Sequence, residues 1–247
     1  MRFVIFSGTT EGRKLSRALA AWGAAVTVCV ATGYGREEQG TVPGVTVLAG
    51  RRDTPEMTAL LRGADVCIDA THPYAVAATA NIRAASLAAG VPCKRLLRAE
   101  STLPADAVTV GSASAAAVFL AGTTGNILLT TGAKELAAFA PLGGGRLYPR
   151  VLPLPASLAA CAAADIPTGN ILALQGPFTR ELNEAMIHQY HIAWLVTKDG
   201  GAVGGFVEKA DAARAGGARL VVLRRPPDSG ETYDEILRQC REMMGCW

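Results

Sequence analysis

Residues 66–82 read VCIDATHPYAVAATANI, and this stretch contains the transition that decides the fold. The apolar run Val66–Ala70 is typical of a buried β-strand, and the alanine-rich segment 76–90 favours a helix that stops at a glycine. A second short β-type run, PCKRLLR, follows at residues 92–98. A strand, a helix and a strand in this order indicate two parallel strands joined by a crossover helix.

The same alternation runs through nearly the whole chain. RFVIF at 2–6, AVTVCVAT at 25–32 and GVTVLAG at 44–50 predict strands, and 9–23 and 53–63 predict helices. Asp53 or Thr54 is expected to cap the latter helix, because Pro55 follows.

After a linker-like stretch at 99–107, the pattern restarts at NILLTT, 126–131. It closes with an amphipathic helix at 232–244. The runs VIFSGTTEGRKL and ILLTTGAKEL resemble each other, through duplication or ordinary α/β alternation. We predict an α/β protein with two Rossmann-like parallel-sheet domains, residues 1–98 and 99–247, and an interdomain cleft.

Composition excludes several classes of function. The net charge is +3, aromatic residues make up 6%, and no block of five like charges occurs, so a nucleic-acid partner is not expected. No apolar run is long enough for a membrane span or a signal peptide. The six cysteines form no CxxC pair and no cluster with histidine, so we expect no metal site. These features favour a protein of the reducing cytoplasm.

Polar and glycine-rich loops follow the predicted strands at their carboxyl ends. They are Ser7–Gly12, Thr71–Tyr74, Thr130–Gly132, Gln175–Phe178 and Lys198–Gly201. In an open parallel sheet, ligands bind beyond the carboxyl ends of the strands. The sequence therefore predicts one cleft lined by the loops of both domains.

Each of these loops also has a purely structural interpretation. SGTTEG at 7–12 lacks the G-x-G-x-x-G pattern, so it is either an anion-binding turn or a tight turn capped by Thr9 or Thr10. The glycines after Lys198 allow a ligand to approach the backbone closely, or they make a mobile loop. Phe178 is available for stacking, or it belongs to the core.

His72 raises the sharpest question about chemistry. We expect Thr71 to cap the following helix and Pro73 to occupy its first turn. His72 and Tyr74 are then directed toward the cleft, where His72 is a positioning group or a proton donor. The alternative is a helix-start residue without chemistry. Basic residues near these loops, among them Arg13 and Arg95, suit carboxylates and phosphates or are surface charges.

Six motifs in order carry a resemblance to a known family. They are GTTEGRKL, DATHPYA, RLLR, LLTTGAKEL, ALQGPFTRELN and LVTKDGGAVGGFVEKADAA. From about residue 3 to residue 226, the chain resembles the precorrin-6A reductases of cobalamin biosynthesis, including the cobalt-precorrin-6A reductases. It departs from the family pattern at Ala133, where arginine is expected, and at Gly200, where serine is frequent.

The resemblance implies hydride transfer from a reduced nicotinamide cofactor to a carbon–carbon double bond of a tetrapyrrole, with protonation of the neighbouring carbon. The product would be precorrin-6B or its cobalt complex. His72 and Tyr74 would act at the macrocycle, and Arg13, Thr71 and Arg95 would bind it. The cofactor-binding residues would be Gly8, Thr9, Thr10, Glu11, Gly12, Thr130, Thr131, Gly132, Gly176, Pro177, Phe178, Lys198, Asp199, Gly201, Glu208 and Lys209.

Rival functions remain open from the sequence. They are another nicotinamide-dependent reductase or an epimerase, a tetrapyrrole-handling lyase or synthase, and a nucleotide sensor without turnover. NADPH is the expected cofactor and NADH is possible. An acidic residue after the second strand would favour NADH, but Arg36 stands beside Glu37 and Glu38 there, so the signal is mixed. The sequence also leaves open whether the substrate carries cobalt, and it is compatible with a monomer.

Overall fold

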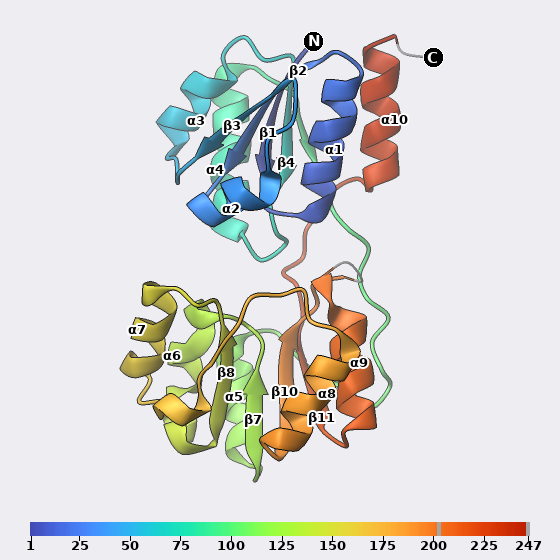
Figure 1. Ribbon diagram of the computed structural model, residues 1–247. Helices are drawn as coiled ribbons and strands as arrows, with labels where there is room; N and C mark the ends of the chain where they lie inside the picture. The colour runs from blue at the N-terminus through green and yellow to red at the C-terminus, as the bar shows by residue number, and fades with distance from the viewer. Residues whose placement is uncertain (202–203, 246–247) are drawn as a thin grey trace. The chain divides into compact units, whose positions relative to one another are not determined.

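The computed structural model describes residues 1–201 and 204–245, and the chain forms two compact units (Figure 1). Unit 1 comprises residues 1–99 together with the chain from Pro226 onward, and unit 2 comprises residues 100–225. All strand pairings of the named strands in the described residues are parallel. The predicted class, two Rossmann-like parallel-sheet domains, is confirmed.

Unit 1 contains a five-stranded sheet in the order β3-β2-β1-β4-β5. Its elements are β1 (Arg2–Ser7), α1 (Thr10–Ala21), β2 (Ala25–Val30), α2 (Gly33–Gln39), β3 (Val45–Ala49), α3 (Thr54–Leu61), β4 (Val66–Ala70), α4 (Val76–Ala89), β5 (Cys93–Arg95) and α10 (Tyr233–Met243).

Alternate residues of β1 supply the two cores of unit 1. Phe3 and Ile5 pack with α1 and α10 on one face of the sheet, whereas Val4 and Phe6 pack with α3 and α4 on the other. Because side chains alternate along a strand, a central strand covered on both faces must be apolar at every position. This requirement explains the continuous apolar run that the sequence shows.

Unit 2 contains a six-stranded sheet in the order β6-β11-β10-β7-β8-β9. Its strands and α-helices are β6 (Val108–Val110), α5 (Ala113–Ala121), β7 (Asn126–Leu129), α6 (Leu136–Phe139), β8 (Leu147–Val151), α7 (Pro155–Ala163), β9 (Leu172–Ala173), α8 (Arg180–Gln189), β10 (Ile192–Lys198), α9 (Phe206–Ala215) and β11 (Arg219–Leu223). The 3-10 turns whose bounds lie within the described residues are η1 (Ala133–Glu135), η2 (Ala140–Leu142), η3 (Gly144–Arg146) and η4 (Thr168–Asn170).

The sheet of unit 2 is also covered on both faces. Ile127 and Leu129 of β7 pack in a core with α5, α6 and α7, and Leu128 packs in a second core with α8 and α9. β6 and α5 lie where the sequence predicted no element. β6 has only three residues, and the alanine-rich α5 has little contrast between its faces, so neither produces a clear periodic pattern.

The C-terminal segment belongs to unit 1, which differs from the expected boundary that placed 226–247 in the second domain. Ile236 and Cys240 of α10 are fully buried in the core that contains Leu15 and Leu19 of α1. In Figure 1 the red helix α10 lies beside the blue helix α1. An amphipathic helix must bury its apolar face, and the face of α1 is the surface that α10 covers.

The segment before α10 extends the sheet of unit 1 beyond β5. Glu231 forms a parallel bridge with Leu96: its N–H donates to Arg95 O at 2.8 Å, and its carbonyl accepts from Leu97 N–H at 2.9 Å. Gly230 lies so close to Arg95 that a Cβ there would stand 2.5 Å from Arg95 O. The returning chain is thus fixed against the edge of the sheet.

The helix starts follow the expected capping chemistry. Thr9 caps α1 by accepting from Gly12 N–H, and Asp53 caps α3 in a capping box with Glu56. These two caps confirm the sequence-based assignments, and they fix where α1 and α3 leave the sheet.

Truncation of Ile236 tests whether α10 is part of the core of unit 1. We expect Ile236→Ala to lower the free energy of unfolding of unit 1 by about 2–4 kcal/mol, because it removes a fully buried aliphatic side chain. Met243→Ala on the same helix is the control; Met243 is 42% exposed, and its truncation should cost about 0.5 kcal/mol or less. Hydrogen exchange of the β1 and α1 amides measures the loss of stability in both variants. Equal losses in Ile236→Ala and Met243→Ala would contradict the packing of α10 on the core of unit 1.

Candidate functional site at the strand ends

Each sheet has one place where the strand order reverses direction. In unit 1 it lies between β1 and β4, and in unit 2 between β7 and β10. At such a switch point the loops that follow the two neighbouring strands lead to helices on opposite faces of the sheet. The gap between these two loops is where open α/β sheets bind ligands. The predicted loops Gly8–Gly12 and Thr71–Tyr74 flank the gap of unit 1, and Thr130–Gly132 and Lys198–Gly201 flank that of unit 2.

The loop after β1 is held against the end of β4. Thr9 Oγ1 accepts from Gly12 N–H at 3.2 Å and donates to Ala70 O at 3.0 Å. A Cβ on Gly12 would lie 2.7 Å from Ser7 Oγ and 2.8 Å from Ala70 Cβ. Gly12 therefore permits close packing of α1 on two strands, which is one of the roles of glycine in dinucleotide-binding turns.

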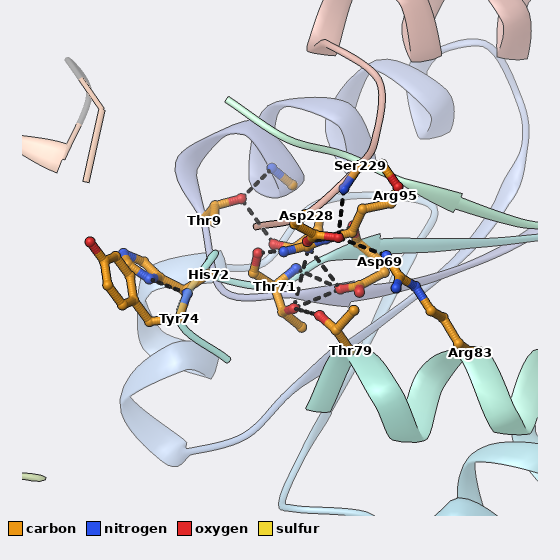
Figure 2. Close-up of polar contacts among 12 residues, drawn as sticks. Thr9, Asp69, Thr71, His72, Tyr74, Thr79, Arg83, Arg95, Asp228 and Ser229 are labelled. Atoms are coloured by element: carbon orange, nitrogen blue, oxygen red, sulfur yellow. Dashed lines mark hydrogen bonds and ion pairs between the residues drawn. The ribbon is translucent and has the colours of Figure 1, made fainter. Parts of the chain in front are cut away.

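A buried charge network lies at the end of β4 (Figure 2). Arg95 Nη1 lies 3.1 Å from Asp69 Oδ1, and Arg95 Nε lies 2.8 Å from Asp228 Oδ2. Asp69 and Arg95 are 0% and 6% exposed. Asp228 also pairs with Arg83 at 2.7 Å. The network joins β4, β5, α4 and the chain that returns from unit 2.

This network fixes the first residue of the loop that carries His72. Thr71 donates from its N–H and its hydroxyl to Asp69 Oδ1, at 3.0 and 2.6 Å, and its carbonyl accepts from Arg95 Nη1 at 2.9 Å. The sequence predicted that Thr71 caps the following helix, and this prediction is wrong. The N-cap of α4 is Ala75, whose methyl side chain cannot form a cap bond, and the hydroxyl of Thr71 is bound to Asp69.

The pKa of Asp228 reflects its place in the network. Burial alone raises the pKa of this carboxyl group, but the hydrogen bond and charge of Arg95, with the hydrogen bond from Arg83, outweigh burial and hold it below the usual value. Arg95 is almost fully enclosed by these partners, so its placement favours a role in holding the loop over direct contact with a carboxylate of the substrate.

His72 and Tyr74 project away from the network, side by side (Figure 2). Their ring centroids are 5.5 Å apart, and Tyr74 N–H donates to His72 Nδ1 at 3.4 Å. Both side chains are half-buried. A Cβ on Gly8 would lie 3.6 Å from His72 N, so the two loops of the switch point touch here. The predicted pair is therefore at the switch point, with Gly8 opposite.

Arg13 and Glu11 make ion pairs within unit 1. Arg13 pairs with Glu38 and donates to Thr10 Oγ1 at 3.2 Å. Glu11 pairs with Arg98 at 2.6 Å, and both side chains are mostly buried. These contacts stiffen the loop after β1, and any role of these residues toward a ligand must operate alongside them.

In unit 2 the loop after β7 presents an unusual hydroxyl group. Thr130 Oγ1 donates to Val196 O at 2.8 Å, which ties the loop to β10. Thr131 is 7% exposed, and its Oγ1 has no hydrogen-bond partner among the described residues. Gly132 adopts φ +84°, and a Cβ there would meet nothing within 4 Å. An orphaned buried hydroxyl beside an open glycine is a fitting place for a ligand.

The loop after β10 is rigidly anchored in unit 2. Lys198 lies 3.0 Å from Glu135, and Asp199 accepts from the N–H groups of Ser101 and Gly201 and pairs with Arg225 at 3.2 Å. Burial alone raises the pKa of Asp199, but these hydrogen bonds and the charge of Arg225 hold it below the usual value. Asp199 thereby shapes the turn at Gly201, which has φ +73°.

The remaining predicted residues lie around the neighbouring strands of unit 2. Gly176, Pro177 and Phe178 follow β9, where a Cβ on Gly176 would stand 3.0 Å from the Phe178 ring. Glu208 and Lys209 lie in the first turn of α9. Glu208 Oε2 is buried without a hydrogen-bond partner among the described residues.

The structure also reveals residues that the sequence analysis did not select. Asp69 was visible as the one charged residue inside an apolar strand, and such a residue needs a buried partner. Asp228 carried no comparable signal, because it reaches the site from a segment 133 residues away from Arg95. Within residues 1–201 and 204–245, no helix has the length and apolar character to cross a membrane.

Comparisons with known proteins agree on one family. The chain matches the family model "Precorrin-6x reductase CbiJ/CobK" over residues 2–241. It is 35% identical over 240 residues to the cobalt-precorrin-6A reductase of Salmonella typhimurium, covering 95% of this chain and 90% of that protein. The precorrin-6A reductase of Rhodococcus erythropolis is 32% identical over 241 residues, with 95% and 94% covered.

A solved structure shares the fold. The protein named "CobK precorrin-6A reductase" superimposes with a TM-score of 0.78 at 23% identity, covering 100% of this chain and 98% of that one. The sequence match extends over the switch-point loops of both units. The chain therefore belongs to the CbiJ/CobK family of precorrin-6x reductases, oxidoreductases of cobalamin biosynthesis.

Proposed function

We propose that this protein uses NADPH to reduce a carbon–carbon double bond of the precorrin-6A macrocycle, or of its cobalt complex, to the corresponding precorrin-6B. The observation that carries the proposal is family membership over residues 2–241, a range that includes every predicted site residue. NADH is the second candidate cofactor. The cytoplasmic location remains a prediction from the sequence.

The residues of the switch points suit a nicotinamide dinucleotide. The buried, unpartnered hydroxyl of Thr131 and the open side of Gly132 can accept a phosphate or ribose group without displacing another side chain. Gly8 and Gly201 let the backbone approach a ligand. The cofactor supplies the hydride when bound. We propose that these residues hold it, together with Thr9, Thr10, Gly12, Thr130, Gly176, Pro177, Phe178, Lys198, Asp199, Glu208 and Lys209.

The protein supplies orientation and a proton on the substrate side. We propose that His72 and Tyr74 contact the macrocycle and that His72 donates the proton to the carbon next to the reduced one. Thr71 and Arg13 line the same loops. Glu11 contributes through its ion pair with Arg98, and Arg95 contributes through Asp69 and Thr71 as a positioning residue.

Anaerobic incubation with NADPH and precorrin-6A tests the function. We expect loss of the reduced nicotinamide absorbance together with one equivalent of reduced macrocycle. Parallel reactions with the cobalt complex and with NADH identify the preferred substrate and cofactor. Cofactor binding without oxidation would indicate a nucleotide sensor, and conversion of the tetrapyrrole without cofactor would indicate a lyase or synthase.

Thr131→Val separates cofactor binding from stability. Removal of a buried hydroxyl that has no partner should leave the free energy of unfolding unchanged or raise it. NADPH should bind about tenfold more weakly, because one hydrogen bond to it is lost. Thr130→Val is the matched comparison and should destabilise unit 2, since its hydroxyl is bonded to Val196 O. Unchanged affinity for NADPH in Thr131→Val would remove this residue from the cofactor site.

His72→Ala tests proton donation. We expect kcat at saturating substrate to fall about 100-fold or more, while the dissociation constant of NADPH stays the same. His72→Gln keeps a hydrogen-bonding group and should recover binding of the macrocycle but not kcat. Full turnover in His72→Ala would end the proton-donor assignment, and a change in KM alone would reduce His72 to a positioning group.

Asp228→Asn tests the network through its pH dependence. The pKa of Asp228 is lowered in the folded state, so its stabilising contribution is complete above the unfolded pKa of about 3.9 and is lost as pH falls through the folded pKa. The variant should lose about 1–3 kcal/mol at neutral pH and show a shallower decline in acid. Asp211→Asn, which removes an exposed partner of Arg214, is the control. Parallel acid-unfolding curves for wild type and Asp228→Asn would refute the ion pair.

A further inference from the structure

Arg150 in β8 is a buried cation without a carboxylate partner. It is 8% exposed, and its Nη1 donates to Asn183 Oδ1 at 2.6 Å. Arg95, the other arginine that is buried among the described residues, pairs with two carboxylates, and the side chains of Arg98 and Arg225, 9% and 8% exposed, also pair with carboxylates. Arg150 makes no such pair within residues 1–201 and 204–245, and burial lowers its pKa to about 10.

The guanidinium group of Arg150 is held in a defined orientation. Its Cζ lies 3.8 Å from the centroid of the Phe178 ring, so the cation rests over an aromatic face. Asn183, which is fully buried, is itself fixed by donating to Thr179 O at 2.7 Å. Only Nη1 is used in hydrogen bonds to described residues, so Nε and Nη2 are available for a ligand.

Lys209, in the first turn of α9, adds a second positive charge in this part of unit 2: Phe178, over whose ring Arg150 lies, packs against the core that contains Phe206 and Ala210 of α9. Burial, and next the charge of Arg150, lower the pKa of Lys209 to about 8, against a smaller opposing effect of Glu208. Among the described residues, the ammonium group donates one long hydrogen bond, 3.5 Å to Gly204 O. Within the part of the chain that the structure describes, Glu208 forms no ion pair with Arg150 or Lys209, and its Oε2, near Gly205, has no hydrogen-bond partner.

A cation in a protein interior, such as Arg150, is costly unless an anion neutralises it, and the charge of the half-buried Lys209 adds to this cost. A planar guanidinium group binds carboxylates and phosphates with two parallel hydrogen bonds, and an ammonium group adds a point charge. We propose that Arg150 and Lys209, with Phe178 as a supporting wall, form a subsite in unit 2 that binds an oxyanion group of a ligand, either a carboxylate or a phosphate.

This inference rests on the proposed function for the choice of probes, because that function supplies two sources of an oxyanion. One is a phosphate of the dinucleotide, and the other is a carboxylate arm of the macrocycle. Both present the same chemistry to the subsite. Binding measurements distinguish them without turnover, so absence of reductase activity would count against the proposed function and leave this inference to be decided separately.

The test compares Arg150→Met and Lys209→Met with Arg214→Met. Arg214→Met is the control. Arg214 lies on the same helix as Lys209, and its replacement removes one positive charge, as the two subsite variants do. Its side chain is 74% exposed, so it is not part of the subsite. Calorimetric titration with NADPH, NADH and uroporphyrin, a stable porphyrin polycarboxylate, gives the affinities. We expect about 10- to 100-fold weaker binding of at least one probe in both subsite variants.

The pattern across probes identifies the oxyanion. A loss confined to NADPH assigns the 2′-phosphate, an equal loss for both nucleotides assigns the pyrophosphate, and a loss confined to uroporphyrin assigns a carboxylate arm. If Arg150→Met does not fold, the half-buried Lys209 carries the test alone. Affinities for all three probes within about twofold of those of Arg214→Met would overturn the proposal.

Proton uptake provides a second readout that a purely structural role would not affect. An anion favours the protonated form of Lys209, so binding near pH 8 should take up a fraction of a proton, and affinity should fall as pH rises further. The charged groups acting on Lys209 are Arg150 and Glu208. Calorimetry in two buffers of different ionisation enthalpy measures the uptake, which Lys209→Met should abolish. Equal uptake in wild type and Lys209→Met would contradict the subsite.

Discussion

Parallel pairing between β1 and β4 is the constraint on which the rest of unit 1 depends. Residues Phe3–Ser7 pair in register with Val66–Ala70, so the two strands end at the same level. The helices that follow them cover opposite faces of the sheet, and the two loops are therefore left facing each other. Close packing at Gly12 and the hydrogen bonds of Thr9 then bring these loops into contact. β7 and β10 repeat this arrangement in unit 2.

Much of this architecture could be predicted from the sequence because it rests on local chemistry. Thr9 and Asp53 cap helices by accepting hydrogen bonds from backbone N–H groups three residues later. The continuous apolar runs of β1 and β4 indicate strands in a sheet that helices cover on both faces. The strand-end loops followed from these assignments. Thr71 was misassigned because its choice of partner depends on Asp69, which competes successfully for the hydroxyl. The place of α10 depends on which apolar face remains uncovered after folding, and sequence periodicity does not contain that information.

Charge pairing divides the site residues into two groups. Glu11, Arg13, Arg95, Lys198 and Asp199 are engaged with other side chains, and their ion pairs hold loops in position. Thr131 and Arg150 are buried without equivalent partners. A sequence identifies both groups only as polar residues near strand ends. The distinction arises from three-dimensional pairing, and it changes which residues are best suited to meet a ligand.

The return of the chain from unit 2 to unit 1 has a consequence for the order of synthesis. Residues 100–225 are continuous, so unit 2 has its complete sequence before the last segment leaves the ribosome. Unit 1 is discontinuous: residues 1–99 are made before unit 2, but Ile236, Cys240 and the edge segment at Glu231 are made after it. Until then the apolar face of α1 lacks its cover. Unit 1 is therefore begun before unit 2 and completed only after it, and an uncovered apolar surface of this kind is the feature that makes partly folded chains prone to aggregation.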